Sequence, residues 1–463
     1  MDERATTPRC ANCAVLESRI AELEARLARL EKNSSNSSKP PSSDIVKPAV
    51  AAGKKHRSRR KRGAQPGHPK HERAAFSPEE IDRTTDYQFS RCPECEGPLE
   101  VLDQPARVLQ QVEIVVQPTR VTEHHSRICR CLKCRKEFVK PIPRAVRKAG
   151  LVGPRLTALV GYLKGACHCS FSTIRKFLQD VVGVGISRGQ LRKVCGKVAR
   201  SLDPAYQDLL AALPAQKRLN VDKTGHKEYK QALWTWCFKA PLFTLFKIDP
   251  SRGSDVLLDV LGSEFSGVLG CDYFSAYRKY LRLNQNVLVQ FCLAHLIRDV
   301  RFLALHPHAK NRAYGKRVLQ ALRDLFGLIH RRHTMSKAKF LGALEDQGYE
   351  VWTQATYRVP STAEAHNLAE RFHQHGREYL RFITTPGVEP TNNLAEQAIR
   401  FVVIDRRVTQ GSRSPAGRKW LERIWTAIAT CIQHGHSVFD FLNQAVRAFF
   451  ANQTAPTLLF GTS

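Results

Sequence analysis

The pattern of hydrophobic and polar positions divides the chain into regions of different texture. Near the start, apolar residues recur at alternating spacings of four and three: Leu16, Ile20, Leu23, Leu27 and Leu30. These are a and d positions of a heptad, so residues 14–32 are predicted to form a short leucine-zipper-like coiled coil that joins copies of the chain. An amphipathic helix packed on its own chain is the alternative.

A second stretch with helical spacing covers residues 150–204, where Ser187 is placed to cap a helix. One face of that helix is apolar: Leu191, Val194, Cys195, Val198 and Leu202. Basic residues lie mostly on its other faces, among them Arg188, Arg192 and Lys193. This pattern is typical of a helix-turn-helix-like DNA-binding segment, and an ordinary helical hairpin is the alternative.

After residue 215 the pattern changes to short apolar or β-branched runs. Residues 217–222, 232–240 and 242–249 predict an antiparallel meander, because polar turns separate them. Helical and strand patterns then alternate over residues 253–305. A meander followed by βα units is the order of a ribonuclease H-like fold. We therefore predict a multidomain α+β protein whose ribonuclease H-like core begins at 215–310.

The region after this first part of the core is polar, basic and helical in pattern. We predict an all-α insertion at 311–386, followed by the second part of the core and C-terminal helices at 387–463.

Three carboxylates occupy informative positions in this predicted core. Asp222 is predicted to end the first strand and Asp272 the fourth, and these strands are neighbours in such a sheet. Two carboxylates about 4 Å apart repel by about 4 kcal/mol at an effective dielectric near 20. A divalent cation removes this repulsion, and oxygen ligands suit Mg²⁺ or Mn²⁺.

A third carboxylate, Glu396, lies in the first turns of a predicted helix that Thr391, Asn392 or Asn393 can cap. Arg400 follows four residues later on the same helical face, placed for phosphate or for Glu396. For each acid taken alone, an ordinary turn or cap residue is the alternative. Their joint position in one fold order favours a catalytic metal site.

Composition points to a polyanionic partner, because 73 Lys and Arg exceed 42 Asp and Glu to give a net charge of +31. A basic run is concentrated in a polar, Pro-bearing segment, residues 33–80: Arg57, Arg59, Arg60, Lys61 and Arg62. We expect a flexible arm that lies along DNA phosphates. A solvated tail is the alternative for the arm, and an anionic membrane surface is the alternative partner. No run of about 18 apolar residues occurs, so no membrane span is expected.

The chain has 14 cysteines, and no export signal is recognisable at its start, which favours metal binding in a reducing compartment over disulfides. Two Cys-x-x-Cys pairs flank a β-rich stretch and predict a zinc module at 87–140. Its predicted ligands are Cys92, Cys95, Cys131 and Cys134. Cys129, or more weakly His124 and His125, are alternative ligands. Cys10 and Cys13 form a third pair that needs a second chain to complete a site.

An ordered set of motifs resembles the IS66-type insertion-sequence transposases, which are DDE transposases. The motifs are "KNSSNSSKPPSSD", "KRGAQPGHPKH", "CPECEGPL…CRCLKC", "VDKTG", "GCDYFSAY", "CLAHLIRD" and "PTNNLAEQAIR". The resemblance covers nearly the whole chain. It implies a ribonuclease H-like core in which Asp222, Asp272 and Glu396 bind two divalent metals. Cys292 and His295 match a Cys-x-x-His element found after the second acid in several transposase families.

The resemblance also implies a reaction and partners. These are metal-dependent cleavage and strand transfer of double-stranded DNA at terminal inverted repeats and a target, in the bacterial cytoplasm at the nucleoid, with small accessory proteins of the same element. Two residues depart from the family pattern: Lys223 replaces a Glu after the first acid, and Tyr273-Phe274 replace Gly-Tyr after the second. The alternatives are a domesticated or inactive DNA-binding protein and a nuclease without strand transfer.

Overall fold

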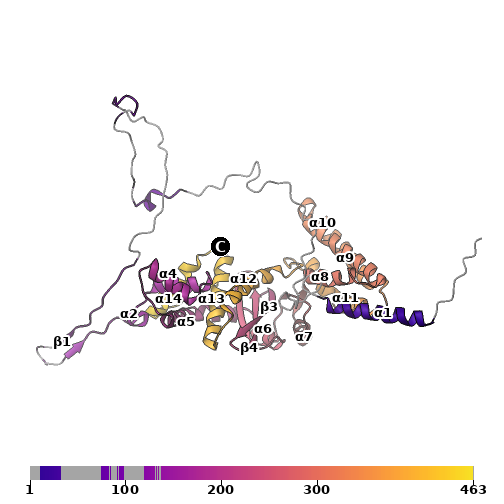
Figure 1. The fold of residues 1–463 in the computed structure, drawn as a ribbon, viewed down its shortest axis with the longest axis horizontal. Coiled ribbons are helices and arrows are strands. Elements are labelled where there is room, and N and C mark those ends of the chain that lie inside the picture. The colour runs from indigo at the N-terminus through magenta and orange to yellow at the C-terminus, as the bar shows by residue number, and fades with distance from the viewer. Residues whose placement is uncertain are drawn as a thin grey trace, which may run out of the picture. The chain divides into compact units, whose positions relative to one another are not determined.

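The computed structural model contains a five-stranded mixed sheet (Figure 1). Its strands are β3 (Arg218–Glu228), β4 (Gln231–Lys239), β5 (Thr244–Asp249), β6 (Val268–Cys271) and β7 (Leu288–Phe291). They lie in the order β5-β4-β3-β6-β7, in which β5, β4 and β3 are antiparallel while β3, β6 and β7 are parallel. The sheet is therefore an antiparallel meander extended by two parallel strands.

The structure describes residues 11–32, 75–82, 84, 91, 93–98, 119–130, 132, 134 and 137–461. The chain divides into two compact units, one made of residues 1–48 with 123–463 and the other of residues 49–122. The five-stranded sheet and the α-helices discussed below belong to the first unit. Within the described residues, no helix is long and apolar enough to cross a membrane.

Strand β3 is longer than the sequence pattern predicts, and Asp222 lies inside it rather than at its end. The prediction was wrong because β3 continues pairing with β4 up to Glu228, opposite Gln231. A two-residue turn, Tyr229-Lys230, joins the two strands. The parallel pairing with β6 stops much earlier, at Asn220 opposite Gly270. Asp222 thus lies just beyond the point where β3 loses its parallel neighbour.

Helix α6 (Asp255–Leu261) joins β5 to β6, helix α7 (Ser275–Leu283) joins β6 to β7, and helix α8 (Leu293–Ala304) follows β7. Their apolar positions recur at helical spacing and are buried, as Tyr277 and Tyr280 of α7 show. Asp272 directly follows β6, as the sequence predicts, and its carboxylate accepts a hydrogen bond from the backbone N–H of Phe274 at 3.0 Å. This bond fixes the turn between β6 and α7.

The outer strand β5 is covered by helix α13 (Pro415–Gln433). Alternate N–H groups of β5 donate to side-chain oxygens spaced four residues apart on α13. The distances are 3.2 Å from Thr244 N to Thr430 Oγ1, 3.0 Å from Phe246 N to Thr426 Oγ1 and 2.8 Å from Ile248 N to Glu422 Oε1. Because an exposed strand edge can pair with other chains, these side chains both satisfy and shield the edge.

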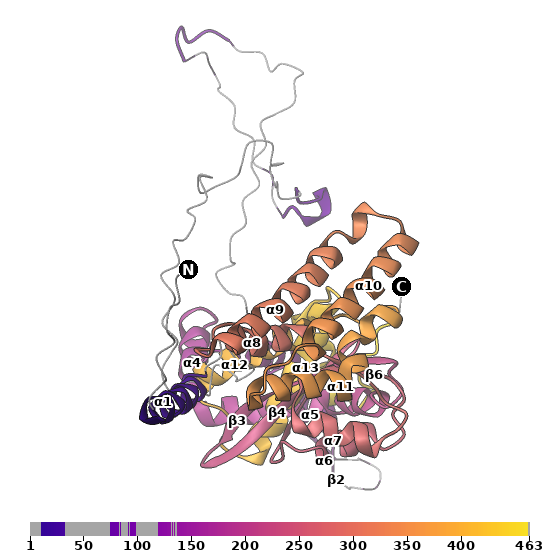
Figure 2. The same ribbon diagram turned by 90° about the vertical axis from the view of Figure 1, so that its right-hand side faces the viewer.

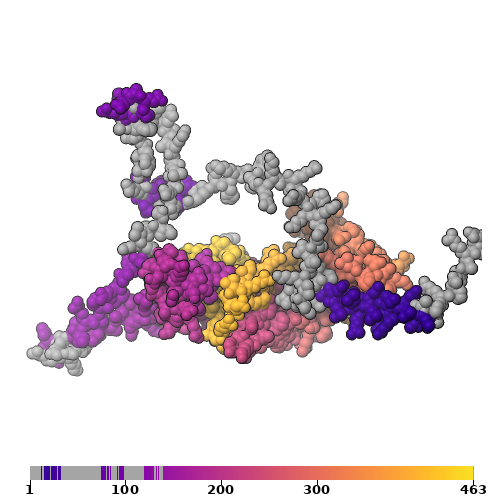
Figure 3. All heavy atoms as spheres, viewed as in Figure 1, coloured from indigo at the N-terminus to yellow at the C-terminus, as the bar shows by residue number. Residues whose placement is uncertain are grey.

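Helices α2 (Arg144–Ala149), α3 (Pro154–Gly165), α4 (Phe171–Asp180) and α5 (Arg188–Ala212) come directly before the five-stranded sheet in the chain. Ser187 caps α5, as predicted, by accepting a hydrogen bond from Gln190 N at 3.2 Å. The predicted apolar face of α5 is buried, although the helix continues to Ala212. Helix α14 (Val438–Ala451) packs on α3 and α5, and Figure 3 shows the yellow C-terminal region against the magenta helices.

Three long helices follow α8: α9 (Ala309–His330), α10 (Lys337–Thr356) and α11 (Ala363–Thr384). A short 3₁₀ turn, η3 (Arg332–Thr334), precedes α10, and α9 and α10 lie side by side (Figure 2). Helix α12 (Asn393–Thr409) then returns to pack against β3 and β4. This return brings Glu396 back to the sheet after a long excursion along the chain.

The remaining elements lie nearer the N-terminus. Helix α1 (Ala11–Leu30) leaves its a and d positions exposed, with 49% of Leu23 and 76% of Leu30 accessible. A 3₁₀ turn, η2 (Pro78–Glu80), belongs to the second unit. Strands β1 (Ile128–Arg130) and β2 (Glu137–Val139) form a small antiparallel pair.

Candidate active site

Asp222 and Asp272 come from adjacent parallel strands at the same level. Asn220 lies opposite Gly270 in the β3–β6 register, and each acid follows two residues later. Both side chains are half-buried. Burial raises the pKa of Asp222 to about 7; Lys223 opposes this change, and the charges of Asp272 and Glu396 add to it. The negative charges of Asp272 and Glu396 therefore repel the carboxylate form of Asp222, and a bound cation would relieve this repulsion.

Lys223 supplies a positive charge inside this acidic group. Its Nζ lies 3.5 Å from both carboxylate oxygens of Asp272, and its side chain is 1% exposed against 19% for Asp272. The ring centroids of Phe274 and Tyr277 lie 4.4 and 4.3 Å from Lys223 Nζ, which is close enough for cation–π interactions. Burial lowers the pKa of Lys223, and the charges of Asp272 and Asp222 oppose that change. The ammonium thus partly neutralises Asp272.

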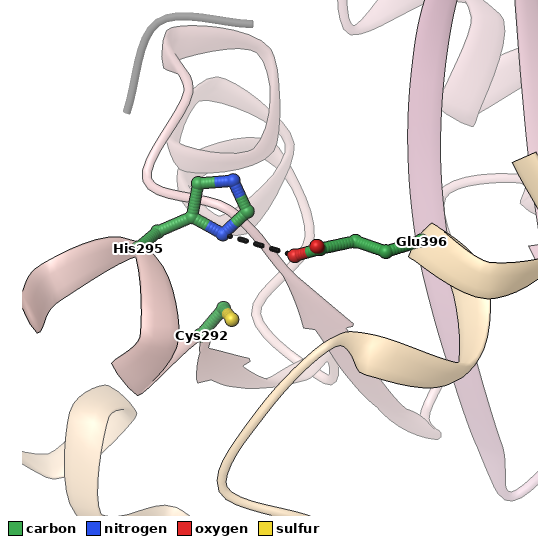
Figure 4. Close-up of side chains that lie close together, drawn as sticks. All are labelled: Cys292, His295 and Glu396. Carbon is green, nitrogen blue, oxygen red and sulfur yellow. Dashed lines mark ion pairs between the residues drawn. The ribbon is translucent and has the colours of Figure 1, made fainter. Parts of the chain in front are cut away.

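Glu396 lies in the first turn of α12, as predicted, and faces α8 (Figure 4). His295 Nδ1 is 3.4 Å from Glu396 Oε1, and Arg298 Nη2 is 3.6 Å from the same oxygen. Oε1 is buried, yet within the described residues it accepts no hydrogen bond. A buried carboxylate oxygen in this state has lone pairs available for a cation.

Asn392 fixes the start of α12 against β3. Its Nδ2 donates to Val221 O at 2.8 Å, and its Oδ1 accepts from Asn220 Nδ2 at 2.9 Å. The sequence predicted a helix cap, and Asn392 does occupy the N-cap position, but its side chain makes no capping bond. It instead joins the helix that carries Glu396 to the strand that carries Asp222. The sequence signal for this role was the paired amides of Asn392-Asn393 at a helix start.

The predicted DNA-binding residues of the helical regions are on the surface. Arg188, Arg192 and Lys193 are exposed on α5, and Arg400 is exposed on α12. The arginine that forms an ion pair with Glu396, at 3.6 Å, is Arg298 of α8. The predicted arm residues lie outside the described part of the chain: Arg57, Arg59, Arg60, Lys61 and Arg62.

The predicted zinc ligands fall only partly within the described residues. Cys92 and Cys131 lie outside them, while Cys95 and Cys134 are exposed. The zinc module therefore stays a prediction. Cys10 also lies outside the described residues.

The carboxylates suit a hard divalent cation better than a soft one. Asp222, Asp272 and Glu396 offer carboxylate oxygens, which are the ligands that Mg²⁺ and Mn²⁺ prefer. The raised pKa of Asp222 and the buried Oε1 of Glu396 both fit a site that gains from a positive ion. The ammonium of Lys223 makes the binding of a cation at Asp272 less favourable.

The fold and the site define a class: an α+β protein with a mixed sheet, whose acids come from two adjacent strands and a returning helix. Residues 149–419 match the Transposase IS66 family. This match spans more than half of the chain, so the chain belongs to the IS66 transposase family. Residues 9–74 match a family of unknown function, DUF6444.

A curated relative is the uncharacterized protein y4qI of Sinorhizobium fredii (strain NBRC 101917 / NGR234). The two sequences are 24% identical over 335 residues, which cover 66% of this chain and 61% of the relative. The chain thus spans about six tenths of the length of that relative.

Proposed function

We propose that this chain is a DDE transposase that cuts and joins DNA at the ends of a mobile element, using Asp222, Asp272 and Glu396. The observation that carries the proposal is the β3–β6 register, which puts Asp222 and Asp272 at one level, together with Asn392, which ties the helix of Glu396 to β3. The strand order β5-β4-β3-β6-β7 supports a ribonuclease H-like core, because an antiparallel meander and two parallel strands are what that fold requires.

The three acids would hold two divalent cations, Mg²⁺ or Mn²⁺. Such cations act as Lewis acids that activate water or a 3′-hydroxyl for attack on a phosphodiester. The chain's own contribution is positional: β3 and β6 fix the two aspartates, and the Asn392 bonds fix the start of α12. Lys223 and Arg298 hold positive charge beside Asp272 and Glu396, where a phosphate would approach.

DNA binding is proposed for the basic surfaces. The exposed residues Arg188, Arg192, Lys193 and Arg400, and the basic arm, would contact phosphates of the terminal inverted repeats and the target. The zinc module would help to recognise the element ends. The exposed apolar positions of α1 support self-association as a coiled coil. We also propose that the chain acts at the bacterial nucleoid together with small accessory proteins of the same element.

A strand-transfer assay tests this function. Full-length protein, labelled element ends, a plasmid target and Mg²⁺ or Mn²⁺ are combined, with Asp272→Ala as the test variant. Asp346→Ala is the matched control, because Asp346 is exposed on α10. We expect metal-dependent joined product from the unchanged chain and from Asp346→Ala, and none from Asp272→Ala.

One observation favours a second candidate, a binding-only protein derived from a transposase. The buried Lys223 partly neutralises Asp272, which weakens the acidic group as a metal site. Tight binding to element ends without cleavage under either metal, even with the accessory proteins added, would favour this candidate. Cleaved ends without joined product would instead indicate a nuclease that lacks strand transfer.

A further inference from the structure

Glu396 belongs to a second group of side chains that differs chemically from the three acids. The sulfur of Cys292, a ring nitrogen of His295 and a carboxylate oxygen of Glu396 all lie within 4.8 Å of one another. Cys292 and His295 come from the junction of β7 and α8, and Glu396 reaches them from α12 (Figure 4). Sulfur, nitrogen and oxygen ligands at this distance form a candidate site for one ion.

Backbone N–H groups surround the sulfur of Cys292. Cys292 is the N-cap residue of α8, and Asn392 N donates to its Sγ at 3.2 Å. The N–H groups of Ala294 and His295 also bond to this sulfur. Burial raises the pKa of the Cys292 thiol to about 11, and the N–H donors and the helix N-terminus oppose that change, so a bound cation would have to displace the thiol proton. Cys292 is 2% exposed.

The spacing of Cys292 and His295 places both on the first turn of α8, where the helix holds them rigidly. His295 Nδ1 faces Glu396 Oε1 at 3.4 Å, so a cation between them would be bound by both atoms. Arg298, at 3.6 Å from the same oxygen, is the positive group with which that cation would compete. Three protein ligands also leave a fourth position for water, as in open zinc sites.

We propose that Cys292, His295 and Glu396 bind a thiophilic divalent cation such as Zn²⁺, and that this binding withdraws Glu396 from the acidic site and inhibits the enzyme. Thiolate and imidazole ligands select Zn²⁺ or Co²⁺ over Mg²⁺. The inhibition rests on the function proposed above, because it requires that Glu396 hold a catalytic cation. The binding itself does not depend on that function.

Cobalt is the probe for the binding step, because Co²⁺ bound to a thiolate gives a charge-transfer absorption band. The full-length chain is titrated with Co²⁺, and the variants Cys292→Ala, His295→Ala and Glu396→Gln are compared with it. Cys195→Ala is the matched control, because Cys195 is also buried but lies on α5. Differences between variants isolate the site from the other cysteines of the chain.

We expect Cys292→Ala to bind one cobalt ion fewer than the unchanged chain, while Cys195→Ala binds the same number. His295→Ala and Glu396→Gln should weaken the affinity of that ion by about tenfold or more. Equal cobalt stoichiometry and band intensity in the unchanged chain and Cys292→Ala would overturn the site. Circular dichroism verifies folding, and Cys292→Ser, which is closer in shape, replaces Cys292→Ala if the alanine variant unfolds.

The regulatory step is tested separately in the Mn²⁺-dependent strand-transfer reaction. Zn²⁺ is added at increasing concentration, and each variant is compared with its own zinc-free rate. The unchanged chain and Cys195→Ala should lose activity at the zinc concentration that fills the site, and Cys292→Ala should need about tenfold more zinc. Equal zinc sensitivity in all three would overturn the inhibition. If the unchanged chain shows no strand transfer even without zinc, that result counts against the proposed function. It does not count against the metal site, because cobalt binding is measured without DNA.

Discussion

The ammonium of Lys223 lies 3.5 Å from each carboxylate oxygen of Asp272, and the two residues approach from strands that are parallel neighbours. The lysine side chain is almost fully buried, and aromatic rings flank it. A charge held this firmly acts as a fixed counter-ion. This counter-ion weakens the electrostatic attraction between Asp272 and a divalent cation.

Replacement of Lys223 should therefore strengthen metal binding. Lys223→Met keeps the length of the side chain and removes its charge. We expect the dissociation constant for Mn²⁺ to fall by about tenfold or more, because a like charge about 4 Å from the site opposes the ion by several kcal/mol before desolvation is counted. Isothermal titration with Mn²⁺ measures the change. Lys227→Met, at an exposed position near the end of the same strand, is the control. Weaker Mn²⁺ binding in Lys223→Met would show that Lys223 organises the site instead.

The Asn392 side chain should matter for both stability and catalysis. Asn392→Ala removes the bond to Val221 O, which then keeps only a 3.5 Å bond from Tyr277 Oη, and the bond from the half-buried Asn220 Nδ2. The free energy of unfolding should fall by about 2–4 kcal/mol. Strand transfer should fall more than stability alone explains, since the start of α12 loses its attachment to β3.

Urea denaturation and the strand-transfer assay measure the two effects of Asn392→Ala. Asn393→Ala is the matched control, because the next residue is exposed. Equal activity in the two folded variants would contradict a positioning role for Asn392.

The sequence was informative about the elements of the sheet because their patterns are strong. The predicted runs of residues 217–305 correspond to β3 through α8 in order. The end of β3 was missed because Asp222 through Glu228 is mostly polar, and polar residues usually mark a turn. The actual turn, Tyr229-Lys230, contains no Gly, Asn or Pro, and Tyr229 adopts a positive φ of 52°.

The surroundings of the acids were harder to predict than the acids themselves. A strand end and a helix start are local features, so Asp272 and Glu396 could be located from neighbouring residues. The partners of Lys223 and Asn392 are separated from them by 49 and 171 residues. Such pairs follow from strand register and from the return of α12, which local patterns do not contain.

Helix α13 should protect the edge of the sheet through its threonines. Thr426→Val keeps the shape of the side chain but removes the acceptor of Phe246 N, which leaves a buried N–H unpaired. The free energy of unfolding should fall by about 1–3 kcal/mol. Chemical denaturation measures this loss. Thr384→Val is the control, since Thr384 is exposed at the end of α11. Equal losses in both variants would mean that the edge bond contributes nothing specific.

The buried imidazole of His226 should make folding sensitive to acid. Ser412 Oγ donates to Glu228 at 3.0 Å, so His226 Nε2 is the donor in its 3.0 Å bond to Ser412. Nδ1 then carries the lone pair, and within the described residues it has no hydrogen-bond partner. Burial, and then the charges of Arg406 and Arg418, lower the pKa of His226 from 6.5 to about 4. The folded chain therefore resists protonation at this ring.

The sign of the pH effect follows from this lowered pKa. Between pH 6.5 and about 4 the unfolded chain binds a proton at this residue that the folded chain does not. Stability from His226 is thus complete above pH 6.5 and is lost as the pH falls toward 4, by about 3 kcal/mol in total. His226→Gln cannot titrate, so its melting temperature should fall less steeply over this range. Melting curves from pH 7 to about 4.5 make the comparison, with the exposed His333→Gln as control. Parallel pH profiles for the unchanged chain and His226→Gln would show that His226 does not control this acid sensitivity.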